Sequence, residues 1–189
     1  MIDPDDLKQS LETLRSGGVI LYPTDTIWGL GCDALNVAAI EKIYAIKGRD
    51  KAKSMIILLE NENQLESYVR EVPDVAYQLI EYSERPLTII YPGAKNLPEA
   101  LIGPGGTIAI RVVRHDFCSP LLQRFRRPIV STSANLSTQP SPTNFGDIHP
   151  DLIEQVDYVV QYGQEIPGDG QPSILMKLEP GGKFEFIRK

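Results

Sequence analysis

The sequence has few of the residues that form disulfide bonds or bind metal ions. It has two cysteines, Cys32 and Cys118, and two histidines, His115 and His149. Two cysteines exclude a disulfide framework and an all-cysteine zinc site, and two histidines leave little for a histidine metal centre. We therefore expect a chain in a reducing compartment, stabilised by its apolar core and without a metal site of its own.

Long apolar runs and a targeting segment are also missing. The longest apolar run is Met55–Leu59, far below the ~20 residues that a membrane-spanning helix needs. The chain starts Met-Ile-Asp-Pro-Asp-Asp, which is acidic where a secretory signal is basic and then apolar. We expect a cytoplasmic protein with no membrane partner.

A basic excess is absent as well. The 189 residues carry a formal net charge of −6, with 42% hydrophobic and 23% charged residues. That balance argues against purely electrostatic nucleic-acid binding and is typical of a globular protein. The length predicts one domain, residues 1–189, and such a chain can bury roughly 70% of its unfolded surface.

Several common catalytic and nucleotide-binding motifs do not occur. No Gly-x-x-x-x-Gly-Lys-Ser/Thr is present, and no Gly-x-Ser-x-Gly or His-Glu-x-x-His. The pairs Gly29-x-Gly31 and Gly168-x-Gly170 are not followed by the third glycine of a dinucleotide fingerprint. If this chain binds a nucleotide, it does so through a motif other than these.

Hydrophobic periodicity predicts an α+β domain. Helices are expected from Pro4 to Gly17, over Asn36–Ile46, after Pro73 and over Cys118–Phe125. Strands are expected over Val19–Tyr22, Ser54–Leu59, Leu87–Tyr91, Thr107–Val113, Pro128–Thr132, Val156–Val160, Ser173–Leu178 and Phe184–Ile187. Several strands follow one another without a helix, which favours a mixed, strongly twisted sheet with helices packed on its faces. The polar stretch Ser133–Phe145 is the longest segment predicted to lack structure.

Positive charge gathers in two segments of this acidic chain. Residues 41–53 sum to +3 and residues 111–127 to +4. Such clusters suit a polyphosphate or an RNA backbone, and they equally suit an ordinary solvated surface.

Two polar segments follow expected strands. Tyr22–Gly31 holds two threonines, an aspartate, a tryptophan and two glycines, and it can be a ligand loop or a tight strand-to-helix connection. Ser131–Ser137 places small hydroxyl side chains directly after a strand, where open sheets often bind ligands, or forms an ordinary turn.

Together these segments resemble the YrdC/TsaC family of L-threonylcarbamoyl-AMP synthases. The matching motifs are Pro23-Thr24-Asp25-Thr26-x-Trp28-Gly29-Leu30-Gly31, Lys47-Gly48-Arg49, Pro86-Leu87-Thr88, Thr107–Val112, Ser133-Ala134-Asn135 and Pro172-Ser173. They occur in the family order over about residues 10 to 188. The resemblance implies a YrdC-like fold and a nucleotidyltransferase of the short, single-domain type.

The resemblance also implies the reaction and its partners. Members condense L-threonine, bicarbonate and ATP into threonylcarbamoyl-AMP and pyrophosphate, with magnesium arriving on ATP. A transferase complex then modifies adenosine in tRNA. Two alternatives stay open: an RNA-binding module for tRNA or double-stranded RNA, and a drifted paralogue on the same fold. The intact Asn135 argues against the paralogue.

Site residues follow from the matched positions. The catalytic residues implied are Lys47, Arg49, Ser133 and Asn135. The threonine contacts implied are Thr26, Arg111, Ser133 and Ser173. The ATP contacts implied are Lys47, Arg49, Lys53, Thr107, Asn135, Thr143 and Arg188. The chain departs from the family pattern at Trp28, Asp50, Ser54, Met55 and Thr138, and the aromatic ring of Trp28 should preserve a wall of the site.

Overall fold

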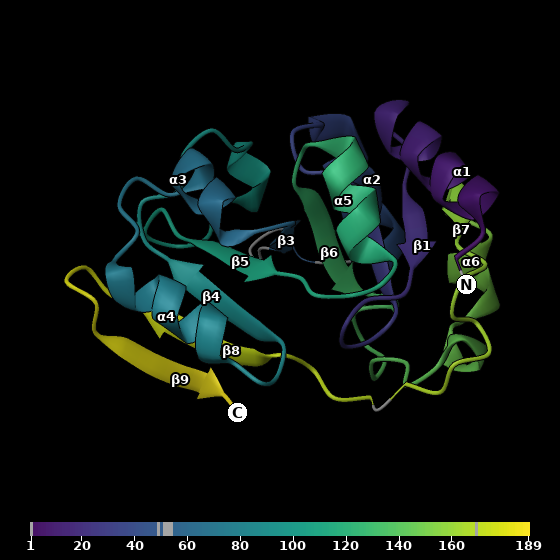
Figure 1. The fold of residues 1–189 in the computed structure, drawn as a ribbon. Coiled ribbons are helices and arrows are strands. Elements are labelled where there is room, and N and C mark those ends of the chain that lie inside the picture. The colour runs from purple at the N-terminus through teal and green to yellow at the C-terminus, as the bar shows by residue number, and fades with distance from the viewer. Residues whose placement is uncertain (1, 49, 51–54, 169) are drawn as a thin grey trace.

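A computed structural model describes residues 2–48, 50, 55–168 and 170–189. Within these residues nine strands form one mixed sheet, with the order β7-β1-β2-β6-β3-β5-β4-β8-β9 (Figure 1). The pairs β1/β7, β3/β5 and β4/β8 are parallel, and the other neighbours are antiparallel. The predicted mixed sheet with helices on its faces is confirmed.

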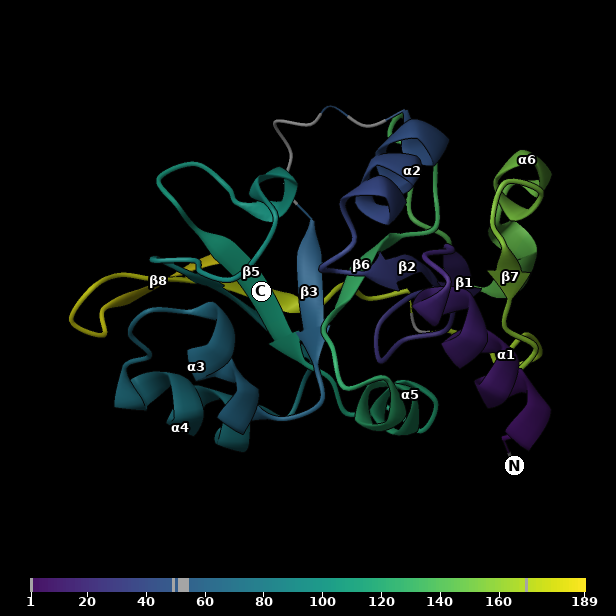
Figure 2. The same ribbon diagram turned by 90° about the horizontal axis from the view of Figure 1, so that it is seen from above.

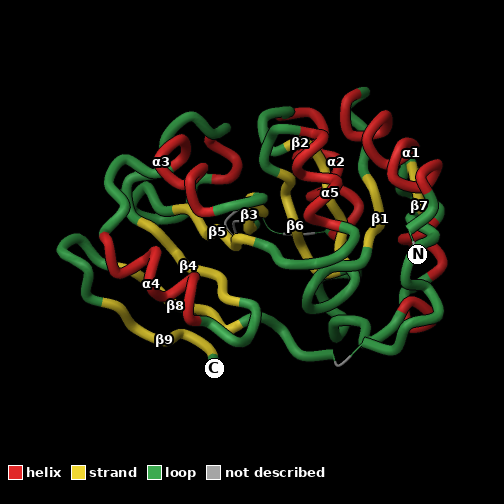
Figure 3. The backbone as a smooth tube through the Cα atoms, in the orientation of Figure 1, coloured by secondary structure: helices red, strands yellow, loops and turns green. Residues whose placement is uncertain are grey.

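The predicted helices and strands are all present, and the structure adds β2, α3 and α6, which the periodicity did not predict. The helices are α1 (Pro4–Arg15), α2 (Val37–Lys47), α3 (Leu65–Tyr68), α4 (Asp74–Tyr82), α5 (Cys118–Phe125) and α6 (Pro150–Ile153). The strands are β1 (Ile20–Tyr22), β2 (Gly29–Asp33), β3 (Ile56–Leu59), β4 (Leu87–Tyr91), β5 (Ile108–Val112), β6 (Ile129–Ser133), β7 (Tyr158–Val159), β8 (Ile174–Leu178) and β9 (Phe184–Arg188). Short 3₁₀ turns lie at Glu62–Gln64, Glu99–Leu101 and Phe145–Asp147. Of the stretch Ser133–Phe145 that was predicted to lack structure, residues 134–144 have no helix or strand, whereas Ser133 ends β6 and Phe145 begins a 3₁₀ turn (Figure 3).

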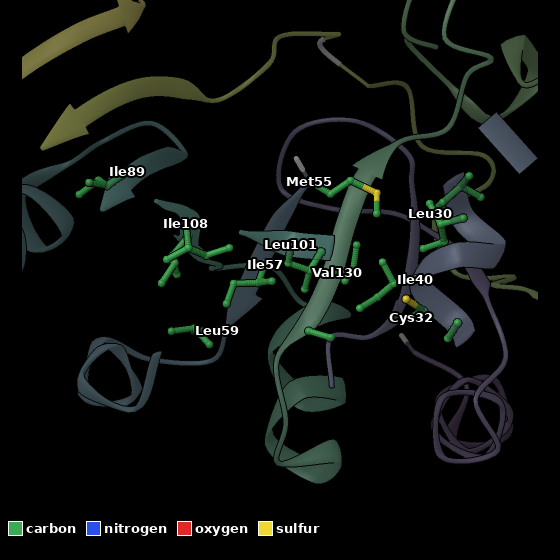
Figure 4. Close-up of a cluster of buried hydrophobic side chains, with 14 of the residues drawn as sticks. Leu30, Cys32, Ile40, Met55, Ile57, Leu59, Ile89, Leu101, Ile108 and Val130 are labelled. Carbon is green, nitrogen blue, oxygen red and sulfur yellow. The ribbon is translucent and has the colours of Figure 1, made fainter. Parts of the chain in front are cut away.

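One face of the sheet carries the larger apolar core. Successive strand residues point to opposite faces, so alternate positions of each strand share a face. A single row of paired residues crosses six neighbouring strands and is buried throughout: Cys32, Val130, Ile57, Ile110, Ile89 and Met176. Helices α2 and α4 pack onto this cluster, and Figure 4 shows Ile40 of α2 beside side chains of β2.

The opposite face is only partly covered. Leu14 of α1 and Leu121 of α5 pack there against Tyr22, Leu58 and other residues of the second apolar cluster. Figure 2 shows α2 on one side of β2 and β6, with α1 and α5 on the other. Because these two helices cover only part of the face, alternate residues of β3, β4, β5 and β8 remain free to line a cavity.

Strand β2 corrects one prediction. The segment Tyr22–Gly31 is a strand-to-strand hairpin, and Gly29 and Gly31 lie inside β2 between β1 and β6. A Cβ on Gly31 would lie 2.6 Å from the Tyr22 ring, and one on Gly29 would lie 3.1 Å from the Thr132 carbonyl oxygen. These glycines therefore allow close packing between strands. The predicted alternative of a strand-to-helix connection is therefore wrong, whereas Gly29 is among the residues that line a cavity.

Helix α2 ends as its sequence predicts. The Asn36 side chain accepts a hydrogen bond from the Ala39 N–H, and Gly48 closes the helix in the left-handed conformation at φ 55°. No helix among the described residues is long and apolar enough to cross a bilayer.

Candidate functional site

The site is a cavity of about 390 Å³ on the partly uncovered face of the sheet. Its floor comes from alternate residues of neighbouring strands. Arg111 of β5 pairs with Thr88 of β4, Thr88 with Leu175 of β8, and Leu175 with Arg188 of β9. All four line the cavity, so one row across four strands brings together residues that are far apart in sequence.

A second row and a loop complete the enclosure. Ser131 of β6 pairs with Ile56 of β3, Ile56 with Ala109 of β5, and Ala109 with Ile90 of β4. The hairpin loop before β2 supplies the facing wall, and the segment before β8 supplies another. The cavity thus joins apolar floor positions with a rim of hydroxyl groups.

Arg111 is the charged group at the centre of this lining. Its side chain is 4% exposed, Nη2 lies 3.1 Å from Asp25 Oδ1, and Nη1 donates to Thr26 Oγ1 at 3.2 Å. Its Nε is buried without a hydrogen-bond partner among the described residues. A buried donor without a partner is costly, and a guanidinium edge suits a planar anion. The cavity therefore offers a place for a carboxylate or phosphate group.

Burial shifts the pKa values of two titratable groups near Arg111. Burial raises the pKa of the Asp25 carboxyl, and the neighbouring Arg111 guanidinium opposes that rise. Burial also lowers the pKa of His115, against the attraction of Asp25. The His115 Nδ1 accepts hydrogen bonds from the Phe117 and Cys118 N–H groups, at 3.3 and 3.4 Å. His115 is therefore held at the start of α5, outside the main cavity.

Ser173 and Arg188 are brought together as one unit. The hydroxyl groups of Ser173 and Thr88 are hydrogen-bonded at 2.8 Å, and both residues are buried. Arg188 donates from Nε and Nη2 to the Ser173 carbonyl oxygen at 3.1 and 2.9 Å. Thr88 was missed as a site residue, although the Pro86-Leu87-Thr88 motif and the alternation along β4 both pointed to it.

Lys47 and Asn135 lie beside the cavity and do not line it. The Lys47 side chain is buried, and its Nζ donates to the Ser133 and Asn135 carbonyl oxygens at 2.5 and 2.6 Å. Asn135 Nδ2 donates to the Leu136 and Gln139 carbonyl oxygens. Lys47 therefore fixes the end of β6 from which Ser133 enters the cavity.

The remaining predicted ATP contacts are more scattered. Thr107 donates to the Pro104 carbonyl oxygen at 3.1 Å and lies outside the cavity lining. Thr143 hydrogen-bonds to Asp147 and lines a second cavity of about 350 Å³ behind the hairpin loop. Arg49 and Lys53, together with the departure at Ser54, lie outside the described residues.

The basic segment 111–127 is not one surface. Arg111 is buried at the cavity, whereas Arg124 and Arg126 are exposed around the end of α5. Arg127 forms an ion pair with Asp33 at 2.9 Å. Most of this segment therefore fits the alternative of an ordinary solvated surface, and only Arg111 of the segment lines the main cavity.

Trp28 does keep an aromatic wall. It is 4% exposed, lines the cavity and packs against Phe145, with ring centroids 4.9 Å apart. The described residues contain no group of three or more histidine, cysteine, aspartate or glutamate side chains that could hold a metal ion.

Sequence comparison links the chain to known proteins. The Sua5/YciO/YrdC family model, described as telomere recombination, matches residues 12–189. A threonylcarbamoyl-AMP synthase of Pseudoalteromonas translucida is 36% identical over 187 residues, covering 97% of this chain and 99% of the relative. A synthase of Pyrococcus abyssi is 32% identical over 93% of this chain and 54% of its own length.

Structural comparison agrees. The crystal structure of P. abyssi Sua5 complexed with L-threonine matches with a TM-score of 0.90 at 28% identity, over all of this chain and 55% of that one. This chain thus spans about half of that longer relative. E. coli YciO matches with a TM-score of 0.85 at 26% identity, over all of this chain and 91% of that one. By these matches and its cavity-bearing mixed sheet, the chain belongs to the Sua5/YciO/YrdC family, and the curated relatives named here are threonylcarbamoyl-AMP synthases.

Proposed function

We propose that this chain is an L-threonylcarbamoyl-AMP synthase that works in the 390 Å³ cavity. The observation that carries the proposal is the buried Arg111 guanidinium, whose Nε has no partner among the described residues. Because Arg111 lines the cavity, an amino-acid carboxylate bound there can pair with its guanidinium charge. The 36% identity to a synthase over nearly the full chain supports the same activity.

The reaction balances without a protein nucleophile. The threonine amine condenses with bicarbonate to give a carbamate and water. A carbamate oxygen then attacks the α-phosphorus of ATP, and the bond from that phosphorus to the bridging β-oxygen breaks. Pyrophosphate leaves with the electron pair. Catalysis then consists of holding the carbamate in line and stabilising charge on the phosphates.

The cavity residues divide between the two substrates. We assign the threonine carboxylate to Arg111 and the rest of the amino acid to the hydroxyls of Thr26, Ser133 and Ser173. Thr26 is the hydroxyl that already accepts from Arg111. Because Thr88 shares a hydrogen bond with Ser173, it belongs to the same set.

We assign the nucleotide to the cationic and polar residues that the family resemblance implies, of which Arg188 lines the main cavity. These are Lys47, Arg49, Lys53, Thr107, Asn135, Thr143 and Arg188. Lys47 contributes by fixing the Ser133 and Asn135 carbonyl groups, which orients the segment that meets ATP. No aspartate or glutamate is among the described residues that line the main cavity. Magnesium, which neutralises phosphate charge, would therefore be held by ATP itself.

The product is a reactive mixed anhydride. We propose that it passes to a tRNA threonylcarbamoyl-transferase complex, and that residues 1–189 form the single domain that makes it. Direct binding of tRNA or double-stranded RNA is the alternative reading.

The deciding experiment measures pyrophosphate release with ATP, magnesium and bicarbonate, with and without L-threonine. We expect strict dependence on threonine and bicarbonate, with an adenylate product of the mass of threonylcarbamoyl-AMP. Threonine-independent release would indicate a drifted nucleotide hydrolase. No release from folded protein would overturn the proposal and favour RNA binding.

A further inference from the structure

The ion pair between Arg111 and Asp25 connects the linings of different cavities. Arg111 lines the main cavity, whereas its ion-pair partner Asp25 lines the 350 Å³ cavity behind the hairpin loop and a third cavity of about 150 Å³. The Asp25 side chain is 8% exposed. The carboxylate therefore holds the guanidinium from the side away from the proposed substrate.

The loop that carries Asp25 is itself fixed. Thr24 Oγ1 donates to the Ile27 carbonyl oxygen at 2.7 Å and accepts from the Thr26 N–H at 3.2 Å. These bonds close a tight turn around Asp25, so its carboxylate has little freedom to follow a moving arginine. The turn thus presents two groups to Arg111 at once, the Asp25 carboxylate and the Thr26 hydroxyl.

The contacts of the guanidinium among the described residues leave one nitrogen, the buried Nε, without a partner. Nη1 and Nη2 each have one contact, and Nε has none. A long arginine side chain loses rotamer freedom when it is fixed, and a fixed fork binds a planar anion at lower entropic cost. The ion pair with Asp25 offsets the entropy lost when the Arg111 side chain is fixed, before any substrate binds.

We infer that Asp25 is a positioning residue, which holds the Arg111 guanidinium in one orientation at the wall of the main cavity, where it can bind an anionic substrate group. The inference rests on the proposed function only for the identity of that group, the threonine carboxylate. Asp25 touches no substrate in this arrangement and acts through Arg111.

The test compares Asp25→Asn with a matched control, Asp33→Asn. Asp33 is also a buried carboxylate in an ion pair with an arginine: it lies 2.9 Å from Arg127, and its side chain is 5% exposed, whereas that of Arg127 is 57% exposed. Asp33 lines none of the three cavities. Both substitutions remove a buried carboxylate charge, so both test stability, and only Asp25→Asn should affect Arg111.

The first readout is the arginine side-chain NMR signals, assigned to Arg111 with Arg111→Lys. We expect separate Nη signals in the wild type and in Asp33→Asn, because rotation about the Nε–Cζ bond is restrained. We expect those signals to merge in Asp25→Asn. Separate Nη signals in a folded Asp25→Asn variant would overturn the inference, and this readout needs no substrate or activity.

The second readout is kinetic. We expect Asp25→Asn to raise the KM for threonine about tenfold, the cost of ~1.4 kcal/mol in positioning, with a KM for ATP near the wild-type value. Equal changes in both KM values would indicate a merely structural role and overturn the inference. If the wild type shows no threonine-dependent turnover, the proposed function fails and the NMR result alone decides the role of Asp25.

A second variant covers loss of folding. If Asp25→Asn does not fold, Asp25→Glu keeps the charge and moves it by one methylene group. We expect it to keep separate Nη signals while raising the KM for threonine. Asp25→Glu with a wild-type KM would overturn the inference, because the position of the carboxylate would then not matter.

Discussion

The two faces of the same strands serve opposite purposes. On one face of β3, Ile57 is fully buried among apolar neighbours, and on the other face of β3, Ile56 lines the cavity. The same alternation separates Ile110 from Arg111 on β5 and Ile89 from Thr88 on β4. One residue of offset therefore decides whether a side chain contributes to folding or to chemistry.

The largest expected effect comes from breaking the apolar face. Ile57→Ala should destabilise the fold by about 2–5 kcal/mol, because it opens a hole in a fully packed row. Chemical denaturation measures the free energy of unfolding. The KM for threonine should stay at the wild-type value in the protein that remains folded. A selective rise in that KM would show that the two faces are coupled.

The matching experiment on the cavity face is Arg111→Ala. We expect the KM for threonine to rise about 100-fold, equivalent to ~2.7 kcal/mol for a charge-assisted pair, with a smaller effect on ATP. Initial rates at varied threonine and varied ATP separate the two. Equal effects on both substrates would remove the carboxylate role of Arg111.

Gly31 lies on the same face as the cavity but where that face is closely packed, so its substitution tests the packing there. An alanine there places a Cβ 2.6 Å from the buried Tyr22 ring, so Gly31→Ala should destabilise the fold by about 1–3 kcal/mol through overpacking. Thermal unfolding of Gly31→Ala beside Gly105→Ala measures this. Both positions are glycine, but a Cβ at Gly105 meets nothing within 4 Å. Gly105 has φ +71°, so its cost should be backbone strain alone. A stability of Gly31→Ala equal to that of the wild type would show that the hairpin can relax.

The smallest effect is expected at Thr88. Thr88→Val keeps the shape and removes the hydroxyl that is hydrogen-bonded to Ser173 at 2.8 Å. We expect a rise of about five- to tenfold in the KM for threonine, equivalent to ~1 kcal/mol for one hydrogen bond. Thr88→Ser, which keeps the hydroxyl, is the control. Equal KM values in the two variants would assign Thr88 to packing.

Much of the fold could be predicted because each element carries a local signal. The Asn36 cap and Gly48 end of α2 are examples, since both act within one turn of helix. Strand β2 could not be predicted from local propensity. Its glycines are required because the Tyr22 ring and the backbone of a neighbouring strand lie too close for a side chain. Those contacts are set by tertiary packing, which no local propensity records.

The candidate site likewise contains residues that the sequence could indicate and contacts that it could not. The motifs indicated Thr26, Arg111, Ser133, Ser173 and Arg188, and the structure brings these residues to one cavity. The ion pair between Asp25 and Arg111 joins positions 86 residues apart, and it depends on how the loop between β1 and β2 packs against β5, which the sequence does not show. Charge counting could not separate Arg111 from Arg127, because a cavity and an exposed surface give the same local charge in the sequence.

The sheet order also bears on how the chain acquires its structure over time. Strand β6 lies between β2 and β3, and β8 pairs with β4, so neighbours in the sheet are often about 90 to 100 residues apart in the chain. Non-local pairing of this kind slows folding, because the entropy of closing long loops is lost before the contacts form. On the ribosome, β2 would emerge long before the strand that covers its edge. We therefore expect the nascent chain to expose an unpaired strand edge until β6 has been synthesised, and to depend on holding chaperones during that interval.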